Sequence, residues 1–286
     1  MLSKIDTLLP KDLKNGKIKT YIEPFVGAGA LFFHILSNYK IENSVLIDNN
    51  KELILCYLVI KYQTELLIDS LEKLRTEYVI GSDTEREEMF YRIRHEFNKN
   101  RINVDFEKFN ADWIKRAAQV IFMNKTCFNG LFRLNRKGEF NVPFGKYSNP
   151  NIVNRENLKA VSRALQNTEI LLGDFSLCSK FEDEKAFIYF DPPYKPISAT
   201  SHFNAYSESE FNDDSQRRLS ILYRELNSKH IKLMLSNSDP RNIDPENNFF
   251  DDLYKGFSIE RVDATRMINC KSEKRGIIKE IIITNY

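Results

Sequence analysis

The stretch Phe187-Ile188-Tyr189-Phe190-Asp191-Pro192-Pro193-Tyr194 joins a continuous apolar run to an acid, two prolines and an aromatic residue. An apolar run without polar alternation is typical of a strand buried on both faces, as in a parallel sheet covered by helices. Such sheets bind their ligands beyond the carboxyl ends of the strands. The stretch therefore predicts an α/β fold with a functional site that begins at Asp191.

The corner after this strand is suited to hold a flat group that carries an amino donor. Pro192 and Pro193 have no backbone N–H and stiffen the chain, so the nearby carbonyls and the Asp191 carboxylate form a fixed row of acceptors beside the Tyr194 ring. The alternative is a strand-ending turn without function, because Pro and Asp are ordinary turn residues.

The composition is that of an ordinary soluble globular protein. The 286 residues are 42% hydrophobic and 29% charged, enough for one large domain or for a core domain with an insertion. The longest apolar run, 53–60, is too short to span a bilayer, and Lys4 and Asp6 stand where a signal peptide is apolar. We expect a cytoplasmic protein with no membrane partner.

Cysteine and histidine spacing predicts neither a disulfide framework nor a metal site. The four cysteines lie far apart without a C-x-x-C pair, and the four histidines show no metal-ligand spacing. The cysteines are Cys56, Cys127, Cys178 and Cys270.

A glycine turn near the N-terminus resembles the first half of a nucleotide-binding unit. A strand candidate at 20–25 runs into Val26-Gly27-Ala28-Gly29-Ala30 and then into a helical pattern at 31–39. Glycines let the backbone approach a ligand, and the helix start offers free N–H groups. A second strand, 44–47, ends in Asp48, nineteen residues beyond Gly29, where an acid can accept hydrogen bonds from ribose hydroxyls. The alternatives are a ligand-free turn and a helix cap at Asp48.

The rest of the chain alternates between helical and strand patterns. Residues 51–112 are mainly helical, and 113–123 continue as an amphipathic helix. The strand 168–172 ends in Gly173-Asp174-Phe175, where Asp174 suits the exocyclic amine of a bound adenine. Helices are predicted at 154–166 and 213–227, a strand at 231–236, and a closing antiparallel hairpin at 257–262 and 277–285.

Residues 124–147 interleave basic and aromatic residues with glycine turns. Residues 115–147 hold seven basic residues against the single acid Glu139: Lys115, Arg116, Lys125, Arg133, Arg136, Lys137 and Lys146. The segment 135–138 is typical of a hairpin turn, with Arg133 and Pro143 on the two arms. Cations for phosphates, an Arg for a guanine edge and exposed aromatics are the parts of a duplex-reading loop. The alternative is a basic surface hairpin without a partner.

Taken together, these motifs resemble those of the Dam-type DNA adenine-N6 methyltransferases, including members of restriction–modification systems that act on GATC. The resemblance runs through 23–29 (EPFVGAG), 128–133 (FNGLFR), 138–147 (GEFNVPFGKY), 191–194 (DPPY) and 235–238 (LSNS). It covers nearly the whole chain, with the motifs in the order of the family.

The resemblance implies a Rossmann-like methyltransferase sheet with helices on both faces, and a mainly helical DNA-recognition insertion that carries a β-hairpin. We expect a catalytic domain at 1–57 and 160–286, with the recognition insertion at 58–159. The implied cofactor is S-adenosylmethionine, with S-adenosylhomocysteine as the product. The implied partner is double-stranded DNA. The methylase would either belong to a restriction–modification system, with a cognate restriction endonuclease acting separately, or be an orphan methylase without such a partner.

The family also assigns roles to positions of this chain. The cofactor pocket would include Glu23, Pro24, Phe25, Gly27, Gly29 and Asp191, with Asp48 at the ribose and Asp174 and Phe175 at the adenine ring. The flipped target base would meet Asp191, Pro192, Pro193 and Tyr194. In the hairpin, Phe128 would intercalate, Asn129 would face the orphaned base, Leu131, Arg133 and Pro143 would read GATC, and Asn141, Lys146 and Tyr147 would contact DNA.

Two alternatives stay open. The family carries a Lys-Trp-x-Gly-Gly-Lys stretch near its N-terminus that residues from Met1 onward do not contain, so a DNA-binding protein of this fold with weak or no methyl transfer is one alternative. Transfer to cytosine N4, or to glutamine side chains by enzymes with Asn-Pro-Pro-Tyr, is the other. The Asp in first place and the basic hairpin favour adenine in DNA.

Overall fold

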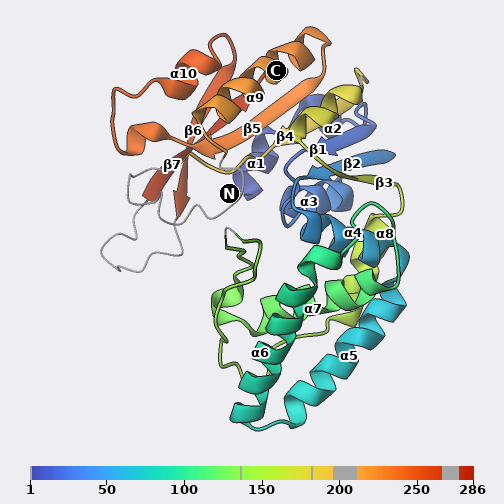
Figure 1. Ribbon diagram of the computed structural model, residues 1–286. Coiled ribbons are helices and arrows are strands. Elements are labelled where there is room, and N and C mark those ends of the chain that lie inside the picture. The colour runs from blue at the N-terminus through green and yellow to red at the C-terminus, as the bar shows by residue number, and fades with distance from the viewer. Residues whose placement is uncertain (1, 136, 182, 196–210, 266–276) are drawn as a thin grey trace. The chain divides into compact units, whose positions relative to one another are not determined.

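The computed structural model describes residues 2–135, 137–181, 183–195, 211–265 and 277–286 (Figure 1). The described chain divides into two compact units. Unit 1 holds the described parts of 2–49, 167–195 and 211–286, and unit 2 holds those of 50–166, so unit 2 is inserted into unit 1. The boundaries differ from the expected insertion at 58–159, which would have cut through two helices, α4 (Lys51–Tyr62) and α8 (Arg155–Ala164). Both helices belong to unit 2 because their apolar side chains, such as Val59 and Leu158, pack in its core.

Unit 1 is built on a seven-stranded sheet with the order β3-β2-β1-β4-β5-β7-β6. Strands β1 to β5 run parallel, whereas β7 is antiparallel to both of its neighbours. The strands are β1 (Thr20–Glu23), β2 (Asn43–Asp48), β3 (Thr168–Leu172), β4 (Ala186–Phe190), β5 (Lys232–Ser238), β6 (Ser258–Thr265) and β7 (Ile277–Thr284). The expected parallel α/β sheet and its closing antiparallel hairpin are confirmed.

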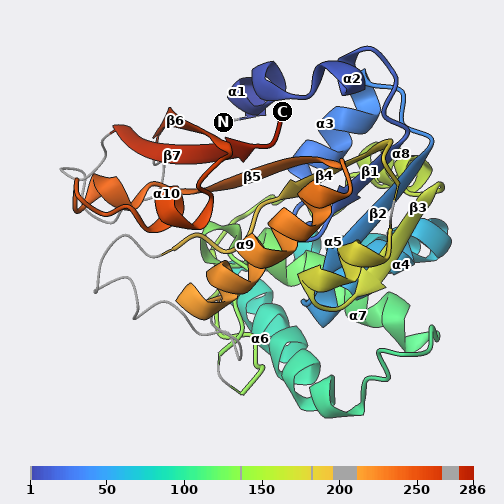
Figure 2. The same ribbon diagram turned by 90° about the horizontal axis from the view of Figure 1, so that it is seen from above.

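Strand β4 lies in the middle of this sheet because every one of its residues is apolar. All five are buried, and β4 pairs with β1 and β5 through contacts such as Ile188 with Ile22 and Phe190 with Leu235. Figure 2 shows helix α3 (Ala30–Asn38) on one face of the sheet and α9 (Asp213–Ser228) on the other. This double cover explains the absence of polar alternation in the strand.

Helix α9 shows how the covering helices form. The Asn212 side chain caps it by accepting the Ser215 N–H, and the buried residues Leu219, Tyr223 and Leu226 recur at intervals of three and four. The other helices of unit 1 are α1 (Leu2–Leu8), α2 (Lys11–Lys14), α10 (Phe249–Leu253), and the 3₁₀ turns η3 (Phe175–Lys180) and η5 (Pro240–Asn242).

Unit 2 is a helical bundle with its own apolar core. It contains α4, α5 (Thr64–Ile80), α6 (Asp83–Asn100), η1 (Arg101–Asn103), α7 (Asp112–Thr126), η2 (Phe128–Gly130) and α8. Helix α4 is capped by Asn50, which accepts the N–H groups of Glu52 and Leu53, so Asp48 is not the cap of this helix. A buried ion pair joins α4 to α7, with the Arg116 guanidinium donating to both oxygens of Glu52.

The expected β-hairpin after α7 is formed differently from a regular ladder. Two isolated antiparallel bridges, Cys127 with Phe144 and Leu134 with Phe140, replace continuous strands among the described residues. The turn is closed by the Asn135 N–H, which donates to the Glu139 carbonyl at 2.8 Å, and by the Asn135 side chain, whose oxygen accepts the N–H groups of Lys137 and Glu139 at 2.9 and 3.0 Å. Side-chain acceptors of this kind compete with ladder hydrogen bonds, and Pro143 has no N–H to donate.

Candidate active site

The predicted cofactor and catalytic residues of unit 1 gather at one edge of the sheet. They follow the carboxyl ends of β3, β2, β1 and β4, which are neighbours in that order and run parallel. Asp174 and Phe175 follow β3, Asp48 ends β2, Glu23 to Gly29 end and follow β1, and Asp191 to Tyr194 follow β4. The structure therefore brings these segments together, although they span more than half of the chain.

The glycine turn and Asp48 are in direct contact. Gly27 and Gly29 have φ angles of 47° and 66°, in the left-handed region that favours glycine, and Gly29 precedes the first turn of α3. The Gly27 N–H donates to Asp48 Oδ2 at 3.0 Å. A Cβ atom at Gly27 would meet no heavy atom within 4 Å, so this stretch of backbone lies open to a ligand.

Aromatic rings and an ion pair mark the part of the site beside β3. The rings of Phe25 and Phe175 stack with centroids 5.3 Å apart, and Phe211 meets both edge-on. Asp174 accepts the Ser176 N–H and pairs with Arg218 Nη2 at 2.7 Å. Burial acts to raise the pKa of Asp174, but these hydrogen bonds outweigh it and lower the pKa.

Glu23 is a buried carboxyl between the glycine turn and the Asp191 corner. The Tyr21 O–H donates to Glu23 Oε2 at 2.6 Å, and the side chain of Glu23 is almost fully buried. Burial is the main reason that the pKa of Glu23 rises to about 8, and the nearby charge of Asp191 adds to the rise. Hydrogen bonds from Tyr21 and the Phe32 N–H oppose it. The site thus holds a carboxyl whose ionised form a cationic ligand would favour.

The Asp191-Pro192-Pro193-Tyr194 corner is clamped by polar side chains that end or face β5. The Lys195 N–H donates to Asn237 Oδ1 at 3.1 Å, and Ser238 Oγ donates to the Lys195 carbonyl at 2.8 Å. Gln216 Nε2 donates to the Pro193 carbonyl at 3.4 Å, and Asn237 Nδ2 donates to Gln216. Asn237 and Gln216 are fully buried, so the clamp is inside the protein.

Asp191 and Tyr194 are electrostatically linked to Glu280 on β7. Although Asp191 keeps an exposed edge, its dense surroundings raise the pKa of the carboxyl to about 6; a hydrogen bond from Tyr194 opposes the rise and the charge of Glu280 adds to it. The Tyr194 O–H donates to Glu280 Oε2 at 3.2 Å, and Tyr194 as a residue is 37% exposed. The corner therefore presents an acceptor and an accessible aromatic face.

The predicted DNA-contacting residues lie together in unit 2. Arg133 Nε donates to Asn141 Oδ1 at 3.0 Å, and the Phe128 N–H donates to the Pro143 carbonyl at 2.9 Å. The Asn129 N–H donates to Tyr147 Oη at 3.3 Å.

Several of these side chains point to solvent. Phe128, Leu131 and Tyr147 are large apolar side chains that stay exposed. Lys146 has a φ of 57°, and Gly145 before it is irreplaceable by a larger residue, because a Cβ would lie 2.6 Å from the Cys127 carbonyl oxygen. Arg136 and Cys270 lie outside the described residues.

Four residues that support the corner had no role predicted from the sequence, although two of them belong to the motif at 235–238: Gln216, Asn237, Ser238 and Glu280. The run Leu235 to Ser238 signals two of them, since a strand that turns polar while it is still buried needs internal partners. Glu280 is signalled by its place as an acid among isoleucines on β7. No sequence pattern identifies Gln216, because a glutamine in the first turns of an amphipathic helix such as α9 is common.

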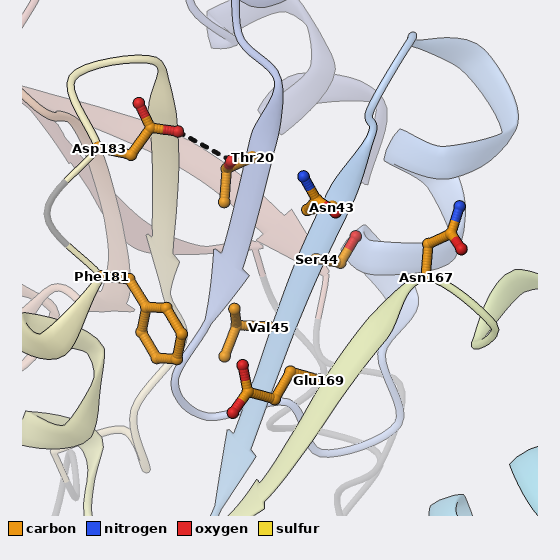
Figure 3. Close-up of a pocket in the computed structure, with 8 residues that line it drawn as sticks. All are labelled: Thr20, Asn43, Ser44, Val45, Asn167, Glu169, Phe181 and Asp183. Carbon is orange, nitrogen blue, oxygen red and sulfur yellow. Dashed lines mark hydrogen bonds between the residues drawn. The ribbon is translucent and has the colours of Figure 1, made fainter.

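A separate cavity of about 340 Å³ opens at the opposite edge of the sheet, near the amino ends of β1, β2 and β3. Figure 3 shows Thr20 Oγ1 donating to Asp183 Oδ2, at 2.9 Å, on one side of it. Its lining consists of Thr20, Asn43, Ser44, Val45, Asn167, Glu169, Phe181 and Asp183. None of these residues belongs to the candidate active site.

The described residues contain no group of three or more His, Cys, Asp or Glu that could hold a metal ion. Among the helices that the structure describes, none is long and apolar enough to cross a membrane.

Comparisons with known proteins extend over both units. The family model of D12 class N6 adenine-specific DNA methyltransferases matches residues 1–268. A type II methyltransferase of Methanocaldococcus jannaschii is 49% identical over 287 residues, which cover 100% of this chain and 95% of the relative. One from Lactococcus lactis subsp. cremoris is 37% identical, covering 100% and 91%. The DNA adenine methylase of Escherichia coli (strain K12) is 32% identical, covering 84% and 77%.

Proposed function

Because this chain belongs to the D12 class N6 adenine-specific DNA methyltransferase family, we propose that it transfers a methyl group from S-adenosylmethionine to the N6 amino group of an adenine flipped out of duplex DNA. We assign GATC as the site, on the resemblance to Dam-type enzymes. We also assign the enzyme to a type II restriction–modification system, with a separate endonuclease of the same specificity. The observation that carries the proposal is the clamped Asp191 corner at the end of β4.

The residues at the neighbouring strand ends fit the cofactor. The open glycine turn allows close approach of a ligand to the backbone, and Asp48 beside it suits ribose hydroxyls. The Phe25 and Phe175 rings offer a flat apolar surface, and Glu23 offers a carboxyl to a cationic amino acid moiety. When bound, S-adenosylmethionine supplies a methyl group activated by a sulfonium.

The corner makes the adenine amino nitrogen a better nucleophile. This nitrogen is a poor one because its lone pair is shared with the ring. The Asp191 carboxylate and the Pro192 carbonyl accept its two N–H hydrogens, which draws the nitrogen towards tetrahedral geometry and frees the lone pair. Tyr194 stacks on the base, and the buried clamp on Lys195 and Pro193 keeps these acceptors in place. The nitrogen lone pair forms the new bond to the methyl carbon as the carbon–sulfur bond breaks, which leaves S-adenosylhomocysteine, and the nitrogen then loses one proton. Catalysis is therefore placement and stabilisation of charge that develops on nitrogen.

Unit 2 supplies the sequence reading. Phe128 is positioned at an exposed turn from which an aromatic ring can enter the base stack, and Arg133 carries a guanidinium that can fork onto a guanine edge. The contacts of Arg133 with Asn141 and of Asn129 with Tyr147 fix the relative positions of these readers.

The test is transfer of labelled methyl from S-adenosylmethionine to otherwise identical duplexes with and without GATC. We expect transfer to GATC duplexes alone. Asp191→Ala should lower turnover by at least ~10²-fold, the scale of removing a group that stabilises developing charge, while DNA retention in a mobility-shift assay stays intact. Asp252→Ala, an exposed acid on α10, is the matched control and should keep normal turnover.

Normal turnover by Asp191→Ala would refute the role of the corner. Tight DNA binding without transfer by the unaltered chain would favour a DNA-binding protein of this fold. Transfer to cytosine in place of adenine, detected by nucleoside analysis of the product, would refute the assigned substrate.

A further inference from the structure

The Tyr194 phenol interacts with two carboxylates, of which only Asp191 takes part in the proposed reaction. Its O–H donates to Glu280 Oε2 at 3.2 Å. A hydrogen bond from the same phenol lowers the pKa of the Asp191 carboxyl. A phenol carries one proton and can donate to one carboxylate at a time, so the two acceptors compete for it.

Glu280 is held by the sheet. It lies on β7, which pairs on both sides, and it stands opposite Ser238 of β5 and Val262 of β6. Ser238 in turn donates to the carbonyl of Lys195, the residue after Tyr194. Tyr194 and Glu280 are therefore tied to adjacent strands, and their contact does not depend on the flexibility of a long loop.

On the basis of the proposed function, we propose that Glu280 is a positioning residue for the reaction. It accepts the hydrogen bond of the Tyr194 O–H, which leaves the Asp191 carboxylate available to the amino group of the target adenine. The same hydrogen bond fixes the Tyr194 ring as the surface on which the base stacks. Without Glu280, the phenol would donate to Asp191 and compete with the amino group for the lone pairs of that carboxylate.

Because Glu280 and Asp191 compete for the Tyr194 O–H, changes to either partner of Asp191 should shift the pKa of Asp191 and the pH profile of activity. Among the residues that the structure describes, the titratable groups that face Asp191 are Tyr21 and Glu23 on β1, Tyr189 on β4, Tyr194, and Glu280 on β7. Removing the charge of Glu280 lowers the pKa of Asp191, whereas removing the phenol O–H raises it. Since the ionised Asp191 is the stronger acceptor of the amino hydrogens, activity falls as the pH falls through its pKa.

The experiment compares pH profiles of methyl transfer for the unaltered enzyme, Glu280→Ala, Glu280→Gln, Tyr194→Phe and the double variant Glu280→Ala/Tyr194→Phe. We expect Glu280→Ala to lower kcat on the order of 10-fold, the factor of a charge-assisted hydrogen bond, and to shift the acid limb to lower pH. Tyr194→Phe should shift that limb to higher pH. The double variant should recover to the level of Tyr194→Phe alone, because the competing proton is gone.

Glu280→Gln removes the charge but keeps an oxygen acceptor, so it should keep most of kcat. This result would show that the hydrogen bond at position 280 matters more than its charge. Glu260→Ala removes an exposed acid from the neighbouring strand β6 and should change nothing. An unchanged kcat in Glu280→Ala would overturn the inference, as would a double variant less active than either single variant with circular dichroism unchanged. If the unaltered enzyme transferred no methyl to adenine, the proposed function itself would fail.

Discussion

Ionisation of Glu23 should make the stability of unit 1 fall as the pH rises through neutrality. Its folded pKa of about 8 lies above the ordinary value of 4.5, so the folded state holds this proton more tightly than the unfolded chain does. The stability that Glu23 contributes is therefore greatest below its ordinary pKa and is lost between there and about pH 8. A difference of one pKa unit corresponds to ~1.4 kcal/mol, so we expect a loss of ~3 kcal/mol between about pH 5 and about pH 7.5.

Glu23→Gln isolates this contribution because the amide does not titrate. Any constant cost of the amide beside Tyr21 cancels when the difference in unfolding free energy between the variant and the unaltered protein is followed with pH. Urea denaturation followed by circular dichroism should show the variant gaining ~3 kcal/mol relative to the unaltered protein over this interval. Glu260→Gln, at an exposed glutamate, should show no such gain. A difference that stays constant from about pH 5 to about pH 7.5 would mean that buried Glu23 is already ionised in the folded protein.

Two further predictions concern the clamp and the DNA reader. Asn237→Ala leaves the Lys195 N–H and the buried Gln216 without their partner, so urea denaturation should show the free energy of unfolding reduced by ~2–3 kcal/mol. The variant's kcat should fall more than its DNA affinity. A stable variant with normal kcat would contradict the clamp. Arg133→Ala should reduce the preference for GATC over a site with one altered base pair by ~1–3 kcal/mol in competition binding, and equal weakening on both duplexes would show that Arg133 contacts only the backbone.

The local elements follow from residue patterns, but the order of the strands does not. The strand expected at 168–172 forms β3 with those bounds, since its apolar residues are bracketed by turn residues, and the apolar run before Asp191 forms β4. The insertion of β7 between β5 and β6 depends on contacts between distant residues that no local pattern records. Helix α1 was not expected because it is short and buries only Ile5.

For the site residues too, local patterns predicted some positions, whereas contacts between distant residues were not predictable. The strand-end acids were identifiable because parallel strands place their carboxyl ends at one edge. The partner of Asp174 was not, since Arg218 lies on α9, 44 residues further along the chain. Glu280 was missed for a similar reason, because its contact with Tyr194 arises only when β7 pairs with β5. The hairpin turn expected at 135–138 is present, but isolated bridges join its arms, a detail that the sequence pattern does not record.

The place of β7 has a consequence for how the protein is made. Residues 50–166 leave the ribosome together and can fold as soon as they emerge, whereas unit 1 must wait for β7, which is synthesised after every other described strand. Until then the buried strand β5, which is apolar over Leu233 to Leu235, has one unpaired edge, and such an edge is a template for pairing with another chain. A truncated chain that ends before Ile277 would thus have a folded unit 2, an aggregation-prone unit 1 and no Glu280.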